Sequence, residues 1–396
     1  MNHPGLADSP IYLDYNATTP VDPRVIDAAL PYLTHHFGNP SSSHAYAAQP
    51  RGAVDHARGQ VADLLGASPG EIVFTAGGSE ADTLAIRGAA LAARSGGRGD
   101  HVITQVTEHP AVLEACHSLQ ADGFTVTQLP VDTYGHVEAA DLAAAITDRT
   151  VLVSIMAANS ETGTLQPLTE LAAIAHRHHA LFHTDAAQTA GKIPIDVTEL
   201  GVDLLTVVGH KMYAPKGIGA LYLRAGIELQ PVIHGGGQER GLRAGTENVA
   251  FIAALGSAAQ IAAGELPASA TRLTALRDLL HHELERLLPG SVQLNGHPTD
   301  RLPGTLNISL AGINGAELLA ATPEIAASTG SACHEGLTTP SAVLTAMGLP
   351  YERARSALRL TLGRWTDNNE VRKAAHLLAD QFTAMRAENP PLPQRL

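Results

Sequence analysis

The sequence predicts an α/β protein, in which a mostly parallel sheet is covered by helices and followed by a smaller α+β domain. Between about residues 70 and 225, short β-rich apolar runs alternate with alanine-rich stretches of helical period, the pattern of βα units. From about residue 262, one amphipathic segment and a few short strands follow. A chain of 396 residues is long enough for two such domains.

Six strands are expected in the first part, each a short run of apolar residues: Glu71–Phe74, His101–Val106, Val151–Met156, Leu181–Thr184, Leu204–Val208 and Ala220–Leu223. Helices are expected between them, as over Glu80–Ala93 and Leu168–His179. Because crossovers between parallel strands are right-handed, these units favour a single sheet.

The second part begins with "GELPASAT", residues 264–271, which is expected to form a linker or a turn. The stretch "LTALRDLLHHELERLL" has apolar residues at a spacing of three and four, typical of an amphipathic helix. Short strands are expected at "TLNISL" and "ALRLTLG". The proline-rich end, "ENPPLPQRL", is expected to fray.

Charge and cysteine content exclude several classes of function. With 39 acidic and 26 basic residues, the chain has a formal charge of −13, so no direct nucleic-acid binding is expected. Two cysteines provide neither a disulfide framework nor a four-ligand zinc site, and no metal site is expected. The first residues lack the features of a secretion signal, and no apolar run suggests a membrane span. A cytoplasmic protein is the expectation.

Ligands of open α/β sheets bind beyond the carboxyl ends of the strands, so the residues that follow each strand are the candidates for a site. Gly77, Gly78 and Ser79 open a helix and offer an anion site, although a plain turn and N-cap would look the same. Asp185 and Lys211 end or follow apolar strands. A lysine amine forms a Schiff base with pyridoxal 5'-phosphate, and a carboxylate keeps the ring nitrogen protonated. Together these residues predict that cofactor.

Other candidates have ordinary structural explanations beside the functional ones. His109 and Asn159 also follow strands, but a lone histidine is more often a capping or surface residue. Cys116 falls on an apolar helical face and is interpreted as a core residue. The histidines of "HRHHA" are expected on a solvated helix face. Cys333 stands instead among small residues in "STGSACHEGLTT", where nothing large can pack over the thiol.

Nine stretches, in order along the chain, closely resemble the cysteine desulfurases, which are class V aminotransferases of the fold-type I pyridoxal-phosphate group. They are "YLDYNATTPVDPRV", "FGNPSSSHAYA", "EIVFTAGGSEADTLAI", "VLVSIMAANSETG", "HTDAAQTAGKIPIDV", "GHKMYAPKGIGALYL", "HGGGQERGLRAGTENV", "STGSACHEG" and "ALRLTLGR". The loop around Cys333 is similar to that of the branch with the longer catalytic loop. The resemblance implies a seven-stranded sheet. It also implies a large cofactor-binding domain over 15–261 and a small domain from 1–14 and 262–396. The small domain would carry the cysteine loop at about 328–340.

The resemblance also implies roles for individual residues. Lys211 would be the Schiff-base lysine, Cys333 the nucleophile that receives sulfur, and His109 the imidazole stacked on the cofactor. The remaining cofactor contacts would come from Asp185 at the ring nitrogen, Gln188 at the ring hydroxyl, Gly78, Ser79 and His210 at the phosphate, and Thr246 at the phosphate of a neighbouring subunit. The substrate-binding residues would be Asn159, Arg359, Asn16 and Ala17.

The implied activity is removal of sulfur from L-cysteine by a homodimer, which leaves L-alanine and a persulfide on Cys333. The persulfide would pass to a sulfur-acceptor protein, for iron–sulfur cluster assembly, tRNA thiolation or DNA phosphorothioation. Alternatives are a selenocysteine lyase or an aminotransferase on the same scaffold, neither of which needs a mobile cysteine, or a sulfur-relay partner without catalysis.

Two departures from the family pattern concern the site. Many relatives have a phosphate-contacting serine three residues before the lysine, where this chain has Val208. The family often has Thr-Ser after the catalytic cysteine, where this chain has His334 and Glu335. A protonated His334 would lower the pKa of the thiol, and Glu335 would oppose this effect.

Overall fold

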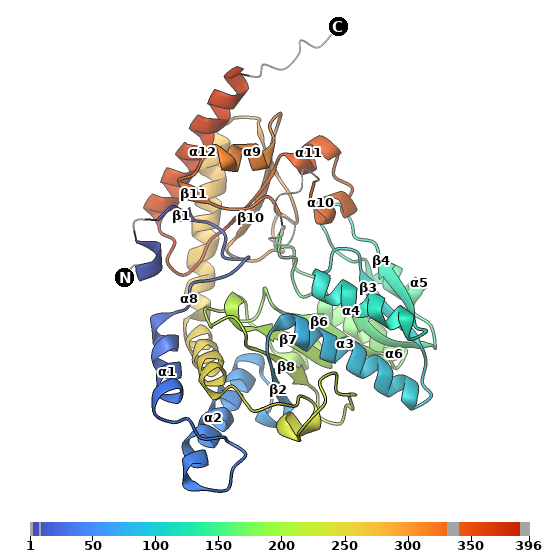
Figure 1. Cartoon of the computed structure of the whole chain (residues 1–396). Helices are drawn as coiled ribbons and strands as arrows, with labels where there is room; N and C mark the ends of the chain where they lie inside the picture. The colour runs from blue at the N-terminus through green and yellow to red at the C-terminus, as the bar shows by residue number, and fades with distance from the viewer. Residues whose placement is uncertain (1–2, 8, 331–339, 389–396) are drawn as a thin grey trace.

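The computed structural model describes residues 3–7, 9–330 and 340–388. The chain forms two lobes, a large one around the central sheet and a small one that contains the end of the chain (Figure 1). The helices are α1 Pro23–Thr34, α2 Ala48–Leu65, α3 Gly78–Ser95, α4 Pro110–Ala121, α5 Ala139–Ala145, α6 Leu168–Arg177, α7 Val197–Leu200, α8 Val249–Leu287, α9 Gly315–Ala320, α10 Ala342–Ala346, α11 Tyr351–Arg355 and α12 Asn368–Glu388.

The large lobe is built on a sheet of seven strands in the order β2-β8-β7-β6-β5-β3-β4. Only β8 runs antiparallel to its neighbours. The strands are β2 Ile72–Thr75, β3 His101–Gln105, β4 Thr125–Leu129, β5 Thr150–Ser154, β6 Leu181–Asp185, β7 Leu204–Val208 and β8 Gly219–Leu223. The predicted α/β fold with a mostly parallel seven-stranded sheet is therefore confirmed.

Both faces of this sheet are buried, because successive side chains of a strand point to opposite faces. Ile72, Ile103 and Leu205 belong to one apolar cluster, which includes side chains of α1, α2, α6 and the first half of α8. Val102 and Leu204, each next to one of these residues, belong to a second cluster with α3 and α4. The continuous apolar runs of the sequence are thus explained by burial on both sides.

The six predicted strands are present with ends that differ by at most two residues, but β4 was not predicted. Its sequence, Thr125–Leu129, is "TVTQL", and of its side chains only Leu129 is buried. β4 lies at the edge of the sheet beside β3. An edge strand with one neighbour needs no apolar run, so the sequence carried little signal for it.

The small lobe has its own sheet and core. β9 Val292–Leu294, β10 Thr305–Leu310 and β12 Ala357–Thr361 form an antiparallel sheet. A short parallel pair joins β1 Ile11–Tyr12 to β11 Ile325–Ala326. Leu13 from the start of the chain is fully buried in the same apolar cluster as side chains of β10, β12, α12 and the second half of α8.

The expected linker at "GELPASAT" is wrong, because these residues lie inside α8 (Figure 1). α8 contains 39 residues and continues through Pro267, which is exposed. A proline inside a helix costs about 3 kcal/mol in isolation, but packing along both lobes outweighs this cost. Leu266 and Leu273, on either side of it, are both buried. The expected domain boundary at 261–262 therefore falls within a helix, and the domain limits stay a prediction.

α8 is also long and apolar enough, by length and composition alone, to cross a membrane. Of its most apolar stretch, 56% is buried inside the protein. Side chains of its first half, such as Leu255, lie in the core below the large sheet, and side chains of its second half, such as Leu280, lie in the small lobe. These contacts are those of a core helix.

Candidate active site

The Lys211 amine lies where the start of the chain crosses the carboxyl edge of the large sheet. Lys211 ends a short 3₁₀ turn, Gly209–Lys211, directly after β7. Its Nζ donates to the backbone carbonyls of Asn16 (2.6 Å) and Ala17 (2.8 Å). The backbone N–H of Thr19 donates to the His210 carbonyl (3.0 Å), which holds the two segments together. The structure therefore brings the Asn16 and Ala17 carbonyls to Lys211, and the role of these two residues in substrate binding stays a prediction.

Asp185 and His109 lie close enough to Lys211 for the three charges to affect one another. Asp185 ends β6 and is 8% exposed. Burial raises the pKa of the Asp185 carboxyl, against the lowering effects of the Ala187 N–H and of the His109 and Lys211 charges. Burial lowers the pKa of His109, and the Lys211 charge adds to this effect. A cationic ring nitrogen is the partner that a buried carboxylate needs.

His109 caps α4, so its structural explanation also holds. The backbone N–H of Ala111 donates to His109 Nδ1 (3.1 Å). The neutral imidazole therefore carries its proton on Nε2. The capping bond fixes the ring and leaves this Nε2–H for a second contact, so the two roles are compatible.

Gln188 faces the same carbonyl as Lys211. Its Nε2 donates to the Asn16 backbone carbonyl (3.0 Å), and its Oε1 accepts from Lys192 Nζ (2.7 Å). Lys192 also donates to Asn16 Oδ1 (3.0 Å). Lys192 was not predicted as a site residue. No local pattern marked it, because Lys192 lies seven residues beyond Asp185, the end of β6.

The first turn of α3 begins beside β7. Gly77, the N-cap, has φ +150°, which favours glycine, and offers no side chain to the helix N–H groups. A Cβ at Gly78 would lie 2.7 Å from Val208 Cγ2. Val208 thus fills the space against Gly78. The exposed Ser79 follows, and a helix start of this kind suits a phosphate.

His210 lies next to Lys211 and contacts the start of the chain. Its Nδ1 is 3.0 Å from Thr18 Oγ1. Burial, together with the charges of Lys211, Lys216 and Lys192, lowers the pKa of His210 to about 4. The imidazole is therefore neutral at pH 7, and its contact with a phosphate would be a hydrogen bond from N–H.

Arg359 lies in β12 and is 1% exposed. Its Nη2 forms an ion pair with Asp14 Oδ1 (2.8 Å). Among the described residues, its buried Nε has no hydrogen-bond partner. A guanidinium held on one side and lacking a partner on another fits a carboxylate ligand. Asp14, which orients it, was not predicted.

Asn159 organises the loop that follows β5. Its Oδ1 accepts from the backbone N–H groups of Glu161 (2.8 Å) and Thr162 (3.0 Å), and its Nδ2 donates to the Thr107 carbonyl (3.2 Å). Asn159 is 2% exposed. These contacts give the side chain a structural role, and its contact with substrate stays a prediction.

Cys333 lies outside the described residues, but both flanking segments contact this site. Ser328 pairs with Arg359 through backbone hydrogen bonds. On the other flank, Ser341 Oγ donates to Glu161 Oε2 (2.5 Å). A Cβ at Gly330 would lie 3.2 Å from the same carboxylate oxygen of Glu161.

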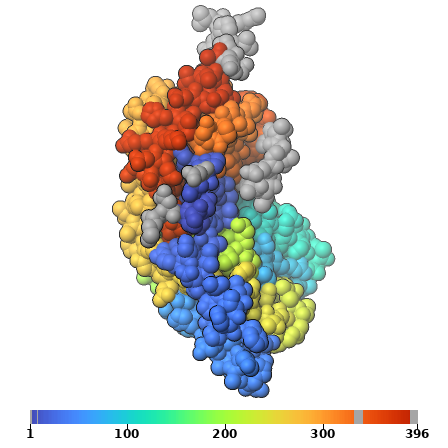
Figure 2. Space-filling model, turned by 60° about the vertical axis from the view of Figure 1, so that its left-hand side comes forward, coloured from blue at the N-terminus to red at the C-terminus, as the bar shows by residue number. Residues whose placement is uncertain are grey.

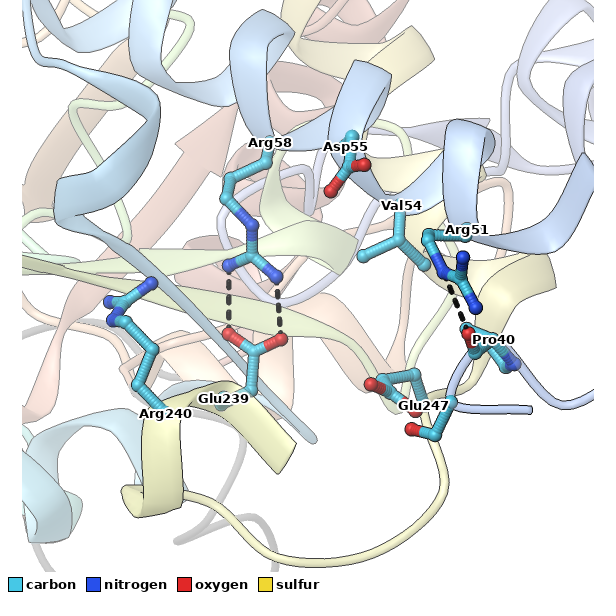
Figure 3. A pocket seen from close by; sticks show the side chains of 9 residues that line it. Pro40, Arg51, Val54, Asp55, Arg58, Glu239, Arg240 and Glu247 are labelled. Atoms are coloured by element: carbon cyan, nitrogen blue, oxygen red, sulfur yellow. Dashed lines mark hydrogen bonds and ion pairs between the residues drawn. The ribbon is translucent and has the colours of Figure 1, made fainter. Parts of the chain in front are cut away.

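Thr246 is exposed, in the segment that precedes α8. The next residue in the chain lines a cavity of about 430 Å³, whose other lining residues come mainly from α2 and from the segment that precedes α8 (Figure 3). In this cavity Arg58 and Glu239 form an ion pair (2.7 Å). The cavity contains none of the predicted site residues. The role of Thr246 at the phosphate of a neighbouring subunit stays a prediction.

Cys116 is a core residue, as interpreted from the sequence. Its side chain is fully buried on α4. Burial raises the pKa of its thiol to about 12, which keeps it protonated.

One group of side chains in the described part of the chain could hold a metal ion: His136, His297 and Asp300, whose ligand atoms lie within 4.8 Å of one another. His297 Nδ1 already accepts the backbone N–H of Asp300 (2.8 Å). A metal on Nε2 would require a proton at Nδ1, which this hydrogen bond opposes. The histidine pair is therefore better explained by ring stacking, at a centroid distance of 4.7 Å.

Comparison with known families agrees with this geometry. A family model described as aminotransferase class V matches residues 11–373. The chain belongs to the class V aminotransferase family. A class V relative named cysteine desulfurase IscS, from Dictyoglomus turgidum (strain DSM 6724 / Z-1310), is 44% identical over 382 residues, which cover 96% of this chain and 96% of the relative. The predicted resemblance is thereby confirmed.

Solved class V structures have the same fold. A NifS-like protein is 35% identical, has a TM-score of 0.87, and is matched over 96% of this chain and 100% of its own. A structure described as SspA in complex with cysteine is 39% identical, with a TM-score of 0.79, over 90% of this chain and 99% of its own.

Proposed function

We propose that the chain is a pyridoxal-phosphate-dependent cysteine desulfurase, which removes sulfur from L-cysteine and collects it on Cys333. The observation that carries the proposal is the arrangement around Lys211. Its amine is held by the Asn16 and Ala17 carbonyls, with Gln188 on the same carbonyl and with the charges of Asp185 and His109 in reach. Family membership and the cysteine desulfurase relatives support the same activity.

The residues of this chain fit the cofactor. Lys211 would hold it through the amine, Asp185 would accept from the ring nitrogen, and Gln188 would donate to the ring hydroxyl. The first turn of α3, with Gly78 packed on Val208, leaves backbone N–H groups for the phosphate. When bound, pyridoxal phosphate supplies an electron sink for bond breaking at the α-carbon of an amino acid.

Arg359 and Lys211 would act on the substrate. The Arg359 guanidinium, anchored by Asp14, would orient the carboxylate of L-cysteine. The Lys211 amine would then take the α-proton. His109, neutral at pH 7 because burial lowers its pKa, would hold a proton at Nε2 near the sulfur.

Cys333 would receive the sulfur as its thiolate. A sulfur–sulfur bond forms while the carbon–sulfur bond of the substrate breaks, and the electron pair of that bond stays with carbon. After protonation the amino acid leaves as L-alanine. The step needs no external oxidant, because the bonding pairs are conserved. The persulfide would then pass to an acceptor protein, which the acidic chain favours over nucleic acid.

A homodimer is part of the proposal. Ile26, Leu30 and Leu33 form an exposed apolar stripe on α1, at a spacing of four and three residues. Phe37 and Tyr46 continue it in the following loop, with ring centroids 5.5 Å apart. Figure 2 shows this segment, in blue, at the surface of the large lobe. An apolar surface of this kind on a monomer marks a protein interface, and a second copy would also direct Thr246 toward a site.

The proposed compartment is the cytoplasm, where a reducing environment keeps a persulfide-carrying thiol free. The persulfidated protein, used to capture its acceptor, would distinguish cluster assembly from thiolation of tRNA or DNA.

Two substitutions test the function. Wild-type protein should take up pyridoxal phosphate, absorb as a lysine-bound cofactor, and release sulfide from L-cysteine with a reductant. Lys211→Ala should lose the lysine-bound absorption, and Cys333→Ala should keep it while losing sulfur release. An unchanged spectrum in Lys211→Ala, or full sulfur release in Cys333→Ala, would contradict the assigned role.

A further inference from the structure

A tight turn after β6 places Lys192 beside Gln188, on the side of Gln188 that faces away from Lys211. The backbone N–H of Lys192 donates to the Thr189 carbonyl (2.9 Å), so residues 188 and 192 share one face of the turn. Gly191 has φ +72°, and a Cβ there would lie 2.7 Å from the sulfur of Met212, the residue after Lys211. The turn thus packs directly against the Lys211 segment.

The Lys192 amine contacts two side-chain amides through their oxygens. It lies 2.7 Å from Gln188 Oε1 and 3.0 Å from Asn16 Oδ1. A lysine amine offers donors, so both amide oxygens must face it and both amide nitrogens must point away. Gln188 Nε2 accordingly donates to the Asn16 carbonyl (3.0 Å), and Asn16 Nδ2 to Thr305 Oγ1 (2.9 Å).

The hydrogen bonds of Lys192 are linked to the Lys211 amine through one shared acceptor atom. The Asn16 carbonyl oxygen accepts from both Gln188 Nε2 and Lys211 Nζ. Without Lys192, only the hydrogen bond to the Asn16 carbonyl would oppose a 180° turn of the Gln188 amide, whose oxygen and nitrogen have nearly the same shape. After such a turn, the amide oxygen would face the ring hydroxyl, where a donor is needed.

The environment of Lys192 suits a structural donor. Burial, with the charges of Lys211 and Arg359, lowers the pKa of Lys192 to about 7. Both the charged and the neutral amine have at least two N–H groups, enough for both amide oxygens. Lys192 also lines a small internal cavity between the lobes, with Tyr15 and Tyr213.

We propose that Lys192 is a positioning residue, which locks the Gln188 amide with its nitrogen toward Lys211 and the cofactor ring. The inference rests on the proposed function, since it gives Gln188 its task. Lys192 itself acts through Gln188 and Asn16.

The test compares Lys192→Met, Gln188→Ala and the double variant in protein loaded with pyridoxal phosphate. The spectrum of the lysine-bound cofactor is titrated with pH, and kcat and KM for L-cysteine are measured. Loss of one hydrogen bond to the ring predicts a fall in kcat of about tenfold in Lys192→Met, with KM little changed. The midpoint of the pH titration of the lysine-bound cofactor should move in Lys192→Met in the same direction as in Gln188→Ala. The double variant should show no further change, because both substitutions remove one interaction. Lys373→Met, which removes an exposed lysine on α12 in the small lobe, is the matched control and should behave as wild type.

A Lys192→Met spectrum equal to that of wild type, or effects that add to those of Gln188→Ala, would overturn the inference alone. A wild-type protein that takes up no pyridoxal phosphate would overturn the proposed function and this inference together. If Lys192→Met does not fold, Lys192→Arg carries the test, because it keeps the donors. Its spectrum should match wild type, and a midpoint displaced as in Gln188→Ala would refute the role.

Discussion

Cys116 shows how far a side chain's surroundings decide its chemistry. The thiol has zero exposure on α4, among apolar side chains that include Val112 and Leu119. Burial raises its pKa to about 12. A thiolate is the reactive form, so this cysteine should be inert in the folded protein.

We therefore expect iodoacetamide to label native protein at Cys333 only. In Cys333→Ala protein, labelling at pH 8 should fall to a background level and reach one label per chain only after unfolding in urea. Peptide mass spectrometry identifies the labelled residue. Rapid native labelling at Cys116 would contradict the burial described here.

Most of the residues around Lys211 could be recognised in the sequence, because each follows a strand and the parallel strands end at one edge. Lys192 and Asp14 could not. Lys192 makes its contacts from the far side of Gln188, through a turn that requires Gly191 at positive φ. Asp14 meets Arg359 across 345 residues of sequence, a contact that no local pattern carries.

At the scale of elements, the N-cap of α1 is Asp22, whose carboxylate also forms an ion pair with Arg364 of the small lobe. Asp22 Oδ1 accepts from the backbone N–H of Arg24 (2.9 Å), and Asp22 Oδ2 pairs with Arg364 (2.5 Å). Burial alone would raise the pKa of Asp22, but these bonds and charges lower it to about 2. The carboxylate therefore stabilises the fold above the pKa of an unfolded aspartate, near 4, and loses this effect as the pH falls toward 2.

Asp22→Asn tests this charge while keeping an acceptor for the cap. At pH 7 we expect a loss of about 2 kcal/mol in the free energy of unfolding, from the displaced pKa. The difference from wild type should shrink between pH 4 and pH 2. Urea denaturation over this pH range measures it, with Asp27→Asn, on the exposed face of α1, as the control. A difference that stays constant down to pH 2 would refute the charge effect.

Pro267 is the element-level error in the sequence prediction. Proline and glycine in "GELPASAT" correctly indicate a weak helix by local propensity. The burial of Leu266 and Leu273 overrides that propensity, and burial depends on partners such as α1 and α12 that are distant in sequence. Local propensity therefore gave the wrong element here, whereas the six strands, buried on both faces, carried their own signal.

Replacing Pro267 by alanine should stabilise the protein. Alanine restores a backbone N–H and relieves the ring clash, which outweighs the greater freedom of the unfolded chain. We expect an increase of about 1 to 2 kcal/mol in the free energy of unfolding. Thermal and urea denaturation measure it. Pro289→Ala, just beyond the end of α8, is the control and should change little. A destabilised Pro267→Ala protein would show that the proline relieves strain in α8.

At the scale of the whole molecule, the large lobe leaves apolar side chains exposed on α1 and the loop after it. Leu33 is 64% exposed and Phe37 is 76% exposed, while Val25 and Ala29 on the opposite face of α1 are buried in the core. One helix thus presents two apolar faces, of which the protein itself covers one. A second copy of the chain is the occupant proposed for the other.

Leu33→Asp should weaken this interface. A charge buried against a partner without a counterion costs several kcal/mol, so we expect a shift from dimer to monomer at micromolar concentration. Analytical ultracentrifugation measures the change. Tyr351→Asp, an equally exposed apolar position on α11 in the other lobe, is the control. A Leu33→Asp protein that keeps the wild-type mass would place the interface elsewhere.

The pairing of Ile11 with Ile325 has a consequence for synthesis on the ribosome. At 5 to 20 residues per second, roughly 15 to 60 seconds separate the emergence of β1 from that of its partner β11. During that interval the carbonyls of Asn16 and Ala17 have no small lobe to hold them over the sheet. If the chain binds pyridoxal phosphate as proposed, the cofactor would be taken up late, after translation is nearly complete.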